Sequence, residues 1–395
     1  MPTTKQAREF WGWLALALLP QPGLAQTTLR VLVPPATPAG AALYVAGSFA
    51  GWQPAAPSYA LSRQADGSYQ LVLPATLRGP QEFKFTRGSW ATGEADSSFQ
   101  PRANRRVVLG AGPTTLTLRV AAWQDQHPGG PPASPRPHTA AANVRVLADS
   151  FRLPQLAGRP RRVWLYLPPG YARHPQRRYP VLYLQDGQNV FDEATAFAGE
   201  WGVDETLNQL AAASPAETGC IVVAVDNGGE RRLDEYSPWG NAQYHKGGEG
   251  DQYTDFLALT LKPYLDAHYR TLPDAAHTGV AGSSMGALLA FYAGLKYPRV
   301  FGRVGVFSPA FWFAKDSLFS YVRRWPAPRA SRFYFVAGPA ESETMLPLMA
   351  EARNLLRAKG VPASHLRLQA PTDGQHAEWF WRREFGPAYR WLLAN

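Results

Sequence analysis

One short stretch of this chain, 280–286, restricts its fold more than any other. It reads Gly-x-Ser-x-Gly with Ser284 at the centre, after a β-like run and before an apolar helical run, 285–296. The flanking glycines permit a turn that is too sharp for a Cβ atom on either side. A serine at such a strand–turn–helix corner presents its hydroxyl where the helix N-terminus directs N–H groups at developing negative charge. The stretch predicts an α/β sheet with Ser284 as candidate nucleophile; the alternative is a plain strand–helix turn.

The second part of the chain, residues 143–395, alternates between short apolar strands and helices. The predicted strands are 162–167, 181–184, 221–225, 278–281, 303–307, 332–337 and 365–368. The predicted helices lie at about 203–213, 251–268, 285–296, 345–359 and 379–393. Continuous apolar strands are typical of parallel sheets that are buried on both faces. The pattern therefore predicts a doubly wound α/β domain in which Ser284 follows a central strand.

The first part, residues 27–122, shows short strands separated by turns and no helical periodicity. The predicted strands are 28–33, 42–46, 69–73, 81–86, 106–109 and 115–120. Asp66-Gly67 is a hairpin signal between two of these strands. This part is predicted to be a small immunoglobulin-like β-sandwich. Residues 123–142, rich in proline and glycine, are predicted to be a linker between the two domains.

The N-terminal residues 1–25 have the pattern of a targeting segment. Lys5 and Arg8 precede an apolar run, 10–19, that prolines then interrupt. The run is too short to span a bilayer, so it predicts a removed secretory signal and no membrane span. The alternative is an amphipathic N-terminal helix. We therefore expect the mature protein to be secreted or periplasmic.

Charge and cysteine content exclude several classes of function. The net charge is +10, but the arginines are scattered and accompany no helix-turn-helix or zinc pattern, so we expect no nucleic-acid partner. The single cysteine, Cys220, lies in an apolar run and is predicted to be inert core. Asp186 could be taken for a metal ligand, but no His or carboxylate accompanies it at the spacing that metal ligands require. We therefore expect neither a metal nor a cofactor.

The nucleophile needs a base and an acid, which in this type of sheet follow it in the chain. His376 lies after the last predicted strand and is the expected base. Glu341 and Glu343 both follow the penultimate strand; Glu341 lies nearer the strand end, and Asp373 is a weaker third candidate. The expected oxyanion donors are the backbone N–H groups of Met285 and Gln188.

Two segments are candidate walls of a substrate pocket. The Gly-rich segment 228–250 follows a central strand. The segment 307–313 follows the first predicted strand after Ser284. Aromatic and arginine side chains suit an aromatic or anionic acyl group. The candidate pocket residues are Arg232, Glu235, Tyr236, Trp239 and Trp312. The alternative for 228–250 is an ordinary capping loop.

Five motifs of the second part resemble those of the esterase family that contains esterase D-like enzymes, siderophore esterases, and feruloyl and acetylxylan esterases. They are Leu184-Gln185-Asp186-Gly187-Gln188-Asn189, Glu200-Trp201, Asp234-Glu235-Tyr236-Ser237-Pro238, Gly282-Ser283-Ser284-Met285-Gly286 and Gly374-Gln375-His376. The resemblance implies an α/β-hydrolase fold with Ser284 as nucleophile and His376 as base. One departure is Ala287, where the family commonly has a second glycine. The acid stays open, since some siderophore esterases of the family work with a serine–histidine pair.

Two motifs of the first part, 47–52 and 82–90, resemble the early-set modules that bind glycogen and starch. The resemblance implies a sugar platform made of Trp52, Trp90, Lys84 and Asn104. Indole faces stack on pyranose rings, while Lys and Asn side chains reach hydroxyl groups. The alternative is that both tryptophans are core or interface residues.

Together these features predict a secreted serine esterase with a carbohydrate-binding-like module. The expected substrate is a feruloyl or acetyl glycan ester, or a siderophore ester, cleaved through an acyl-enzyme. The expected further partner is an α-glucan bound by the first domain. The alternatives are an acyltransferase that uses the same triad, or a glycan-binding protein with an inactive hydrolase domain.

Overall fold

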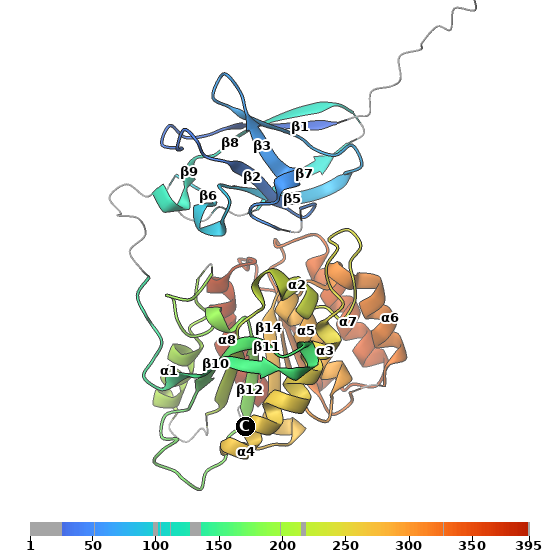
Figure 1. The fold of residues 1–395 in the computed structure, drawn as a ribbon. Helices are drawn as coiled ribbons and strands as arrows, with labels where there is room; N and C mark the ends of the chain where they lie inside the picture. Colours follow the sequence, from blue (N-terminus) through green and yellow to red (C-terminus); the bar gives the residue numbers. More distant parts are fainter. Residues whose placement is uncertain are drawn as a thin grey trace, which may run out of the picture. The chain divides into compact units, whose positions relative to one another are not determined.

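The chain forms two compact units, Met1–Ala133 and Ser134–Asn395, which are described separately. The computed structural model describes residues 26–50, 52–97, 102, 104–110, 112–126, 136–197, 199–214, 219–326 and 328–393 (Figure 1). The predicted signal segment 1–25 lies outside these residues. So does the middle of the predicted linker, whose two ends are described. Both described ends of this linker are attached to folded units. At one end, Trp123 is fully buried in the first unit; at the other, the Ala141 N–H donates to Asp204 Oδ2 of the second unit at 2.7 Å.

The first unit is all-β in the part that the structure describes. Its strands lie in the order β7-β5-β2-β3-β4-β1-β8, with a separate pair β6-β9. Their bounds are β1 Thr27–Leu32, β2 Leu43–Gly47, β3 Ala60–Arg63, β4 Tyr69–Val72, β5 Gly79–Thr86, β6 Glu94–Ala95, β7 Arg105–Leu109, β8 Thr114–Arg119 and β9 Ala122–Trp123. The Asp66-Gly67 turn joins β4 to β3, a strand that the sequence analysis missed because Ala60–Arg63 lacks β-branched and aromatic residues.

The second unit is built on an eight-stranded sheet, in the order β10-β11-β13-β12-β14-β15-β16-β17. The strands are β10 Val144–Leu153, β11 Arg159–Tyr166, β12 Val181–Gln185, β13 Ile221–Val225, β14 Thr278–Ser283, β15 Arg303–Phe307, β16 Arg332–Val336 and β17 Leu366–Gln369. The strands from β13 to β17 run parallel, whereas β10 and β11 are antiparallel to their neighbours. Because parallel strands end at one edge, the loops after β12, β14, β15, β16 and β17 meet there.

The helices cover both faces of this sheet, which confirms the predicted doubly wound α/β fold (Figure 1). They are α1 Val203–Ala213, α2 Arg232–Glu235, α3 Gly250–Phe256, α4 Lys262–His268, α5 Met285–Lys296, α6 Lys315–Arg324, α7 Met345–Ala358 and α8 Glu378–Leu393. A π turn, Leu257–Leu261, joins α3 to α4. Helices α3 to α7 pack on one face, and α1 and α8 on the other. None of the helices in the described part of the chain is both long and apolar enough to cross a membrane.

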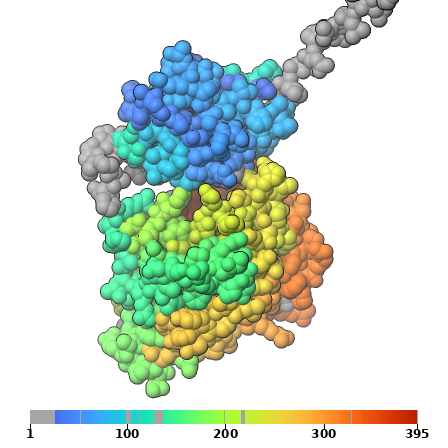
Figure 2. All heavy atoms as spheres, in the orientation of Figure 1, coloured from blue at the N-terminus to red at the C-terminus, as the bar shows by residue number. Residues whose placement is uncertain are grey.

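β10, α2 and α6 of this unit were not predicted from the sequence. β10 is an edge strand with two register shifts and no regular alternation of buried side chains. The face of the molecule in Figure 2 shows β10 and β11, in green, at the surface of this unit. An edge strand of this kind lacks the buried apolar run by which the central strands were recognised.

Candidate active site

Ser284 occupies a strained turn between β14 and α5. Its backbone has φ 54° and ψ −118°, outside the regions that non-glycine residues prefer. In the described stretch 278–295, Ser284 is the one residue that is not buried. A side chain at Gly282 would place its Cβ 2.7 Å from the carbonyl carbon of Gly286, so the turn closes only with glycine there. This turn between β14 and α5, called the elbow below, thus presents the Ser284 hydroxyl at an otherwise buried edge of the sheet.

Glu341 and His376 are hydrogen-bonded to each other at the same edge of the sheet. His376 Nδ1 lies 2.9 Å from Glu341 Oε2. The Glu341 side chain is 1% exposed, whereas the imidazole is 37% exposed. Glu343, the alternative acid, is exposed to solvent. Asp373, the third candidate, binds Arg383 NH2 through Oδ1 at 3.0 Å. Of the three carboxylates considered from the sequence, the structure brings Glu341 to the imidazole.

The loops that carry Glu341 and His376 touch backbone to backbone. A Cβ at Gly338, which follows β16, would lie 1.9 Å from the carbonyl oxygen of Gly374, which precedes His376. Neither loop can therefore move toward the other, and a side chain at Gly338 would push the His376 loop away. The contact between these two loops, which are distant in sequence, therefore helps to hold the His376 imidazole at hydrogen-bonding distance from Glu341.

A chain of aromatic contacts leads from the His376 ring to Phe307, whose backbone binds Ser284, although no hydrogen bond joins the side chains of the described residues Ser284 and His376. The His376 ring packs edge-on against Trp381 with centroids 5.2 Å apart. Trp381 packs on Trp201 at 5.8 Å, and Trp201 packs on Phe307 at 5.0 Å. The Phe307 carbonyl accepts the Ser284 N–H at 3.0 Å. Nucleophile–base bonds are often long before substrate binds and tighten in the complex.

The predicted oxyanion donors lie on two elements at this edge. Met285 is the first residue of α5, and Gln188 lies in the short 3-10 helix Gly187–Asn189 after β12. The Gln188 side chain accepts the Asn227 N–H at 3.2 Å, and its carbonyl accepts the Thr195 hydroxyl at 2.8 Å. The first of these bonds anchors the Gln188 loop to the residues after β13, and the second ties the loop to its own continuation.

Two of the predicted pocket residues are wrong, because they are fully buried. Glu235 is 0% exposed and pairs with Arg159 at 2.9 Å and with Arg161. Tyr236 is also 0% exposed, and its hydroxyl accepts the Asp186 N–H at 3.0 Å. These contacts fix the part of the segment around Glu235 and Tyr236 to the start of β11 and the end of β12, away from any bound molecule.

The other three predicted pocket residues differ in their exposure. Arg232 binds both oxygens of Asp186, at 2.6 and 2.8 Å, so its guanidinium is committed to that buried carboxylate. Trp239 packs against Tyr292 at 5.4 Å and is half-buried. Trp312 is 39% exposed, and its ring lies 5.6 Å from that of Tyr244. Among the five, Trp312 therefore offers the most aromatic surface for a bound molecule.

One group of carboxylates in the described part of the chain is close enough to hold a metal ion: Glu200, Asp204 and Glu205. Arg382 lies beside the group, 3.7 Å from a Glu200 oxygen and 4.0 Å from a Glu205 oxygen. Burial raises the pKa of Glu200 to about 7 and the pKa of Asp204 to about 7, and the Glu205 charge adds to both shifts. One oxygen of each of these two residues has no hydrogen-bond partner. The group is therefore a site where ionised carboxylates cost stability.

Asp204→Asn is expected to raise the free energy of unfolding at pH 8 by roughly 1–2 kcal/mol. A carboxyl with a raised pKa in the folded state destabilises the protein fully above that pKa, about 7 for Asp204. The penalty fades as the pH falls toward the ordinary value near 4. The asparagine still accepts the Ala141 N–H, which lies 2.7 Å from Asp204 Oδ2. Urea denaturation of both proteins at pH 5 and pH 8 measures the effect. An equal difference at both pH values would contradict this account.

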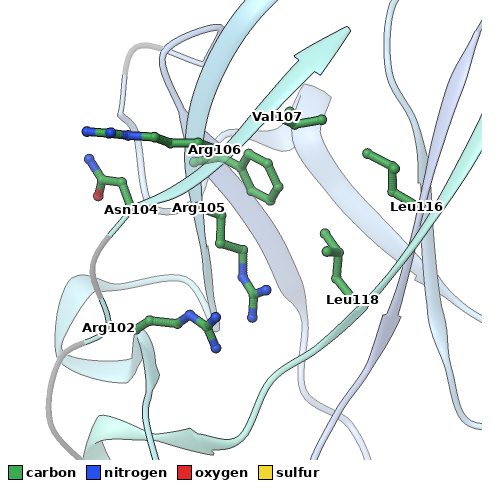
Figure 3. Close-up of a pocket in the computed structure, with 8 residues that line it drawn as sticks. Arg102, Asn104, Arg105, Arg106, Val107, Leu116 and Leu118 are labelled. Carbon is green, nitrogen blue, oxygen red and sulfur yellow. The ribbon is translucent and has the colours of Figure 1, made fainter. Parts of the chain in front are cut away.

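In the first unit, the structure brings together the two tryptophans that the sequence analysis considered for a sugar platform. The rings of Trp52 and Trp90 lie 6.4 Å apart with an interplanar angle of 35°. Lys84 lies on β5, and Asn104 Nδ2 donates to Glu82 Oε2 at 3.1 Å. Asn104 also lines a hollow of about 470 Å³ beside β7 and β8. Figure 3 shows Leu116 and Leu118 on one side of this hollow, and Asn104 and three arginines on the other.

Comparison with known proteins gives one family match. A family model described as "Putative esterase" matches residues 155–392, which is more than half of the chain. An uncharacterised protein of Bacillus subtilis (strain 168), YbbA, is 25% identical over 247 residues, 60% of this chain and 93% of that protein. The iron(III) enterobactin esterase of Dickeya dadantii (strain 3937) is 28% identical over 257 residues, 60% of this chain and 52% of that protein.

Two further similarities are to a curated protein that matches a short stretch of the chain and to a solved structure. An alpha-amylase of Niallia circulans is 42% identical over 106 residues, which are 27% of this chain and only 8% of that protein. The crystal structure of the BES protein from Bacillus cereus has a TM-score of 0.50 at 17% identity, covering 66% of this chain and 98% of that one. At this identity the structural similarity concerns the fold alone.

Proposed function

This chain belongs to the esterase family and is a carboxylic ester hydrolase of the α/β-hydrolase type, and from that premise we propose that Ser284, His376 and Glu341 are its catalytic triad. The observation that carries the proposal is the 2.9 Å contact between His376 Nδ1 and Glu341 Oε2. It lies at the sheet edge where the strained elbow presents Ser284. The test is hydrolysis of a p-nitrophenyl ester by the purified chain and by its Ser284→Ala variant.

In the proposed mechanism, Ser284 Oγ attacks the ester carbonyl while His376 Nε2 takes its proton. The Nδ1–H donates to Glu341, so the lone pair lies on Nε2, where a base is needed. The N–H groups of Met285 and Gln188 stabilise the oxyanion. The imidazolium then protonates the leaving alcohol, and an acyl-enzyme remains. Water, deprotonated by His376, releases the acid and restores the Ser284 hydroxyl.

We propose that the acyl group carries an aromatic ring, as in a feruloyl glycan ester or a catecholate siderophore ester. Support comes from Trp312 and Tyr244, whose rings lie 5.6 Å apart. The Ala310 N–H, two residues before Trp312, donates to the Ser284 carbonyl at 3.0 Å. Activity on feruloyl, acetyl-xylan and catecholate esters, measured on one preparation, decides between the classes. Transfer of the acyl group to an added sugar would instead favour an acyltransferase.

A second candidate function is binding of an α-glucan by the first unit. The neighbouring indoles of Trp52 and Trp90 favour it, as does the 42% identity over 106 residues to an alpha-amylase. Trp52→Ala and Trp90→Ala are each expected to weaken binding to glycogen about 10-fold, because each removes one stacking face. Affinity electrophoresis in glycogen gels measures this. Trp325→Ala, a partly exposed tryptophan of the second unit, is the matched control. If the parent and all three variants migrate equally in gels with and without glycogen, α-glucan binding by the first unit is excluded.

We also propose that residues 1–25 are removed on export and that the mature protein is secreted or periplasmic. The basic residues and the short apolar run of this segment support the proposal. The intact mass of the protein recovered from culture medium and periplasm tests it, since an uncleaved N-terminus would contradict export by this route.

A further inference from the structure

The corner 307–310, which follows β15, holds the nucleophile from both sides. The Phe307 carbonyl accepts the Ser284 N–H at 3.0 Å, and the Ala310 N–H donates to the Ser284 carbonyl at 3.0 Å. Both backbone groups of the strained serine are thus paired with the same neighbouring corner. The strain of the elbow is maintained because this corner cannot shift without losing both bonds.

Ser308, in the same corner, connects the nucleophile to the acid. Ser308 is fully buried, and its hydroxyl lies 2.9 Å from Glu341 Oε1. The Gly338 N–H donates to the same oxygen at 2.6 Å. Oε1 therefore has two donors, which leaves Oε2 to face His376 Nδ1 at 2.9 Å. Hydrogen-bond donors of this kind offset the cost of burying a carboxylate.

Trp381 determines in which direction the Ser308 hydroxyl points. The indole Nε1–H lies 2.9 Å from Ser308 Oγ and can only donate. It occupies a lone pair of the hydroxyl, so the single hydroxyl proton is free to point at Glu341. The ring of Trp381 also packs edge-on against His376, with centroids 5.2 Å apart. Trp381 thus contacts the base directly and the acid through Ser308.

We propose that Ser308 is a positioning residue: its hydroxyl, oriented by Trp381, fixes the Glu341 carboxylate so that Oε2 faces the imidazole. The inference rests on the proposed catalytic role of Glu341 and His376. The backbone alone does not call for serine at this position. Ser308 has φ 44°, a left-handed conformation that glycine adopts with less strain. The buried hydroxyl is what a glycine could not supply.

The two contributions of Ser308 can be separated by three substitutions. Ser308→Ala and Ser308→Gly both remove the hydroxyl, but glycine relieves the backbone strain and alanine does not. Ser308→Thr keeps the hydroxyl and adds a β-branched side chain, which increases the strain. We expect kcat to fall about 10-fold in the alanine and glycine variants, with KM within about two-fold, and to stay near the parent value in the threonine variant. Melting temperature should follow a different order, with glycine above alanine and threonine lowest.

The role of Trp381 is tested by Trp381→Phe, which keeps ring packing against His376 but removes the N–H donor. We expect a smaller fall in kcat, about three-fold, and no further loss when it is combined with Ser308→Ala, since both act on one hydrogen-bond chain. Trp325→Phe is the matched control. Trp325 takes no part in the hydrogen bonds between Trp381, Ser308 and Glu341, so its replacement should leave kcat unchanged.

A spectroscopic measurement makes the test independent of turnover. The low-field proton resonance of His376 Nδ1–H, assigned by its absence in His376→Ala, should move in Ser308→Ala and Ser308→Gly and remain in place in Ser308→Thr. The inference is overturned if the resonance does not move, or if kcat follows melting temperature across the Ser308 variants. Failure of the proposed triad would look different: the Ser284→Ala variant would then be as active as the parent.

Discussion

Replacing Ser284 by alanine is expected to lower kcat/KM for p-nitrophenyl butyrate by about 10⁴-fold or more. In the proposed mechanism, the substitution removes the oxygen atom that forms the acyl-enzyme. It leaves the turn intact, because Ser284 N–H and C=O remain bonded to Phe307 and Ala310. Substrate affinity should therefore change little. The measurement is the initial rate of p-nitrophenol release by the parent and the variant at matched concentrations.

Ser283→Ala is the matched control for this experiment. Ser283 ends β14 directly before the proposed nucleophile and is 6% exposed. We expect its activity to stay close to that of the parent. Equal turnover by the parent and the Ser284→Ala variant would exclude Ser284 as nucleophile, whatever the result for Ser283.

The second large effect is expected at the acid: Glu341→Gln should lower kcat about 10²- to 10⁴-fold. The amide oxygen of glutamine would take the bonds from Gly338 N–H and Ser308 Oγ, at 2.6 and 2.9 Å in the parent. Its NH₂ group would then face His376 Nδ1 and donate to it. The imidazole would carry its proton on Nε2, where it cannot accept the proton of Ser284. The rate of deacylation and of acylation should fall together.

Glu343→Gln is the matched control, because this carboxylate lies two residues further on and is exposed. We expect its kcat to remain near that of the parent, with at most a small loss of stability from its position before α7. The reverse result, a large loss for Glu343→Gln alone, would move the acid to that residue. Full activity of both variants would leave a serine–histidine pair as the working unit.

The sequence alone predicted the order of most strands and helices in the second unit. These elements are long apolar or periodic runs, and their type depends on residues close together in the chain. It missed Ala60–Arg63 and Val144–Leu153, which lack such runs because one is polar and the other is an irregular edge strand. It also predicted the residue type and position of the elbow, since Gly-x-Ser-x-Gly is a local steric requirement.

The tertiary structure decided which distant side chains meet. It placed Glu341 rather than Glu343 against His376, because Gly338 packs on Gly374 and sets the height of the two loops. It buried Glu235 against two arginines of β11 and Tyr236 against the end of β12, although their residue types suit a pocket. It also revealed Ser308 and Trp381, which carry no recognisable motif. Local propensity follows from neighbours in the chain, whereas a hydrogen bond between loops depends on the packing of the whole sheet, which no single stretch encodes.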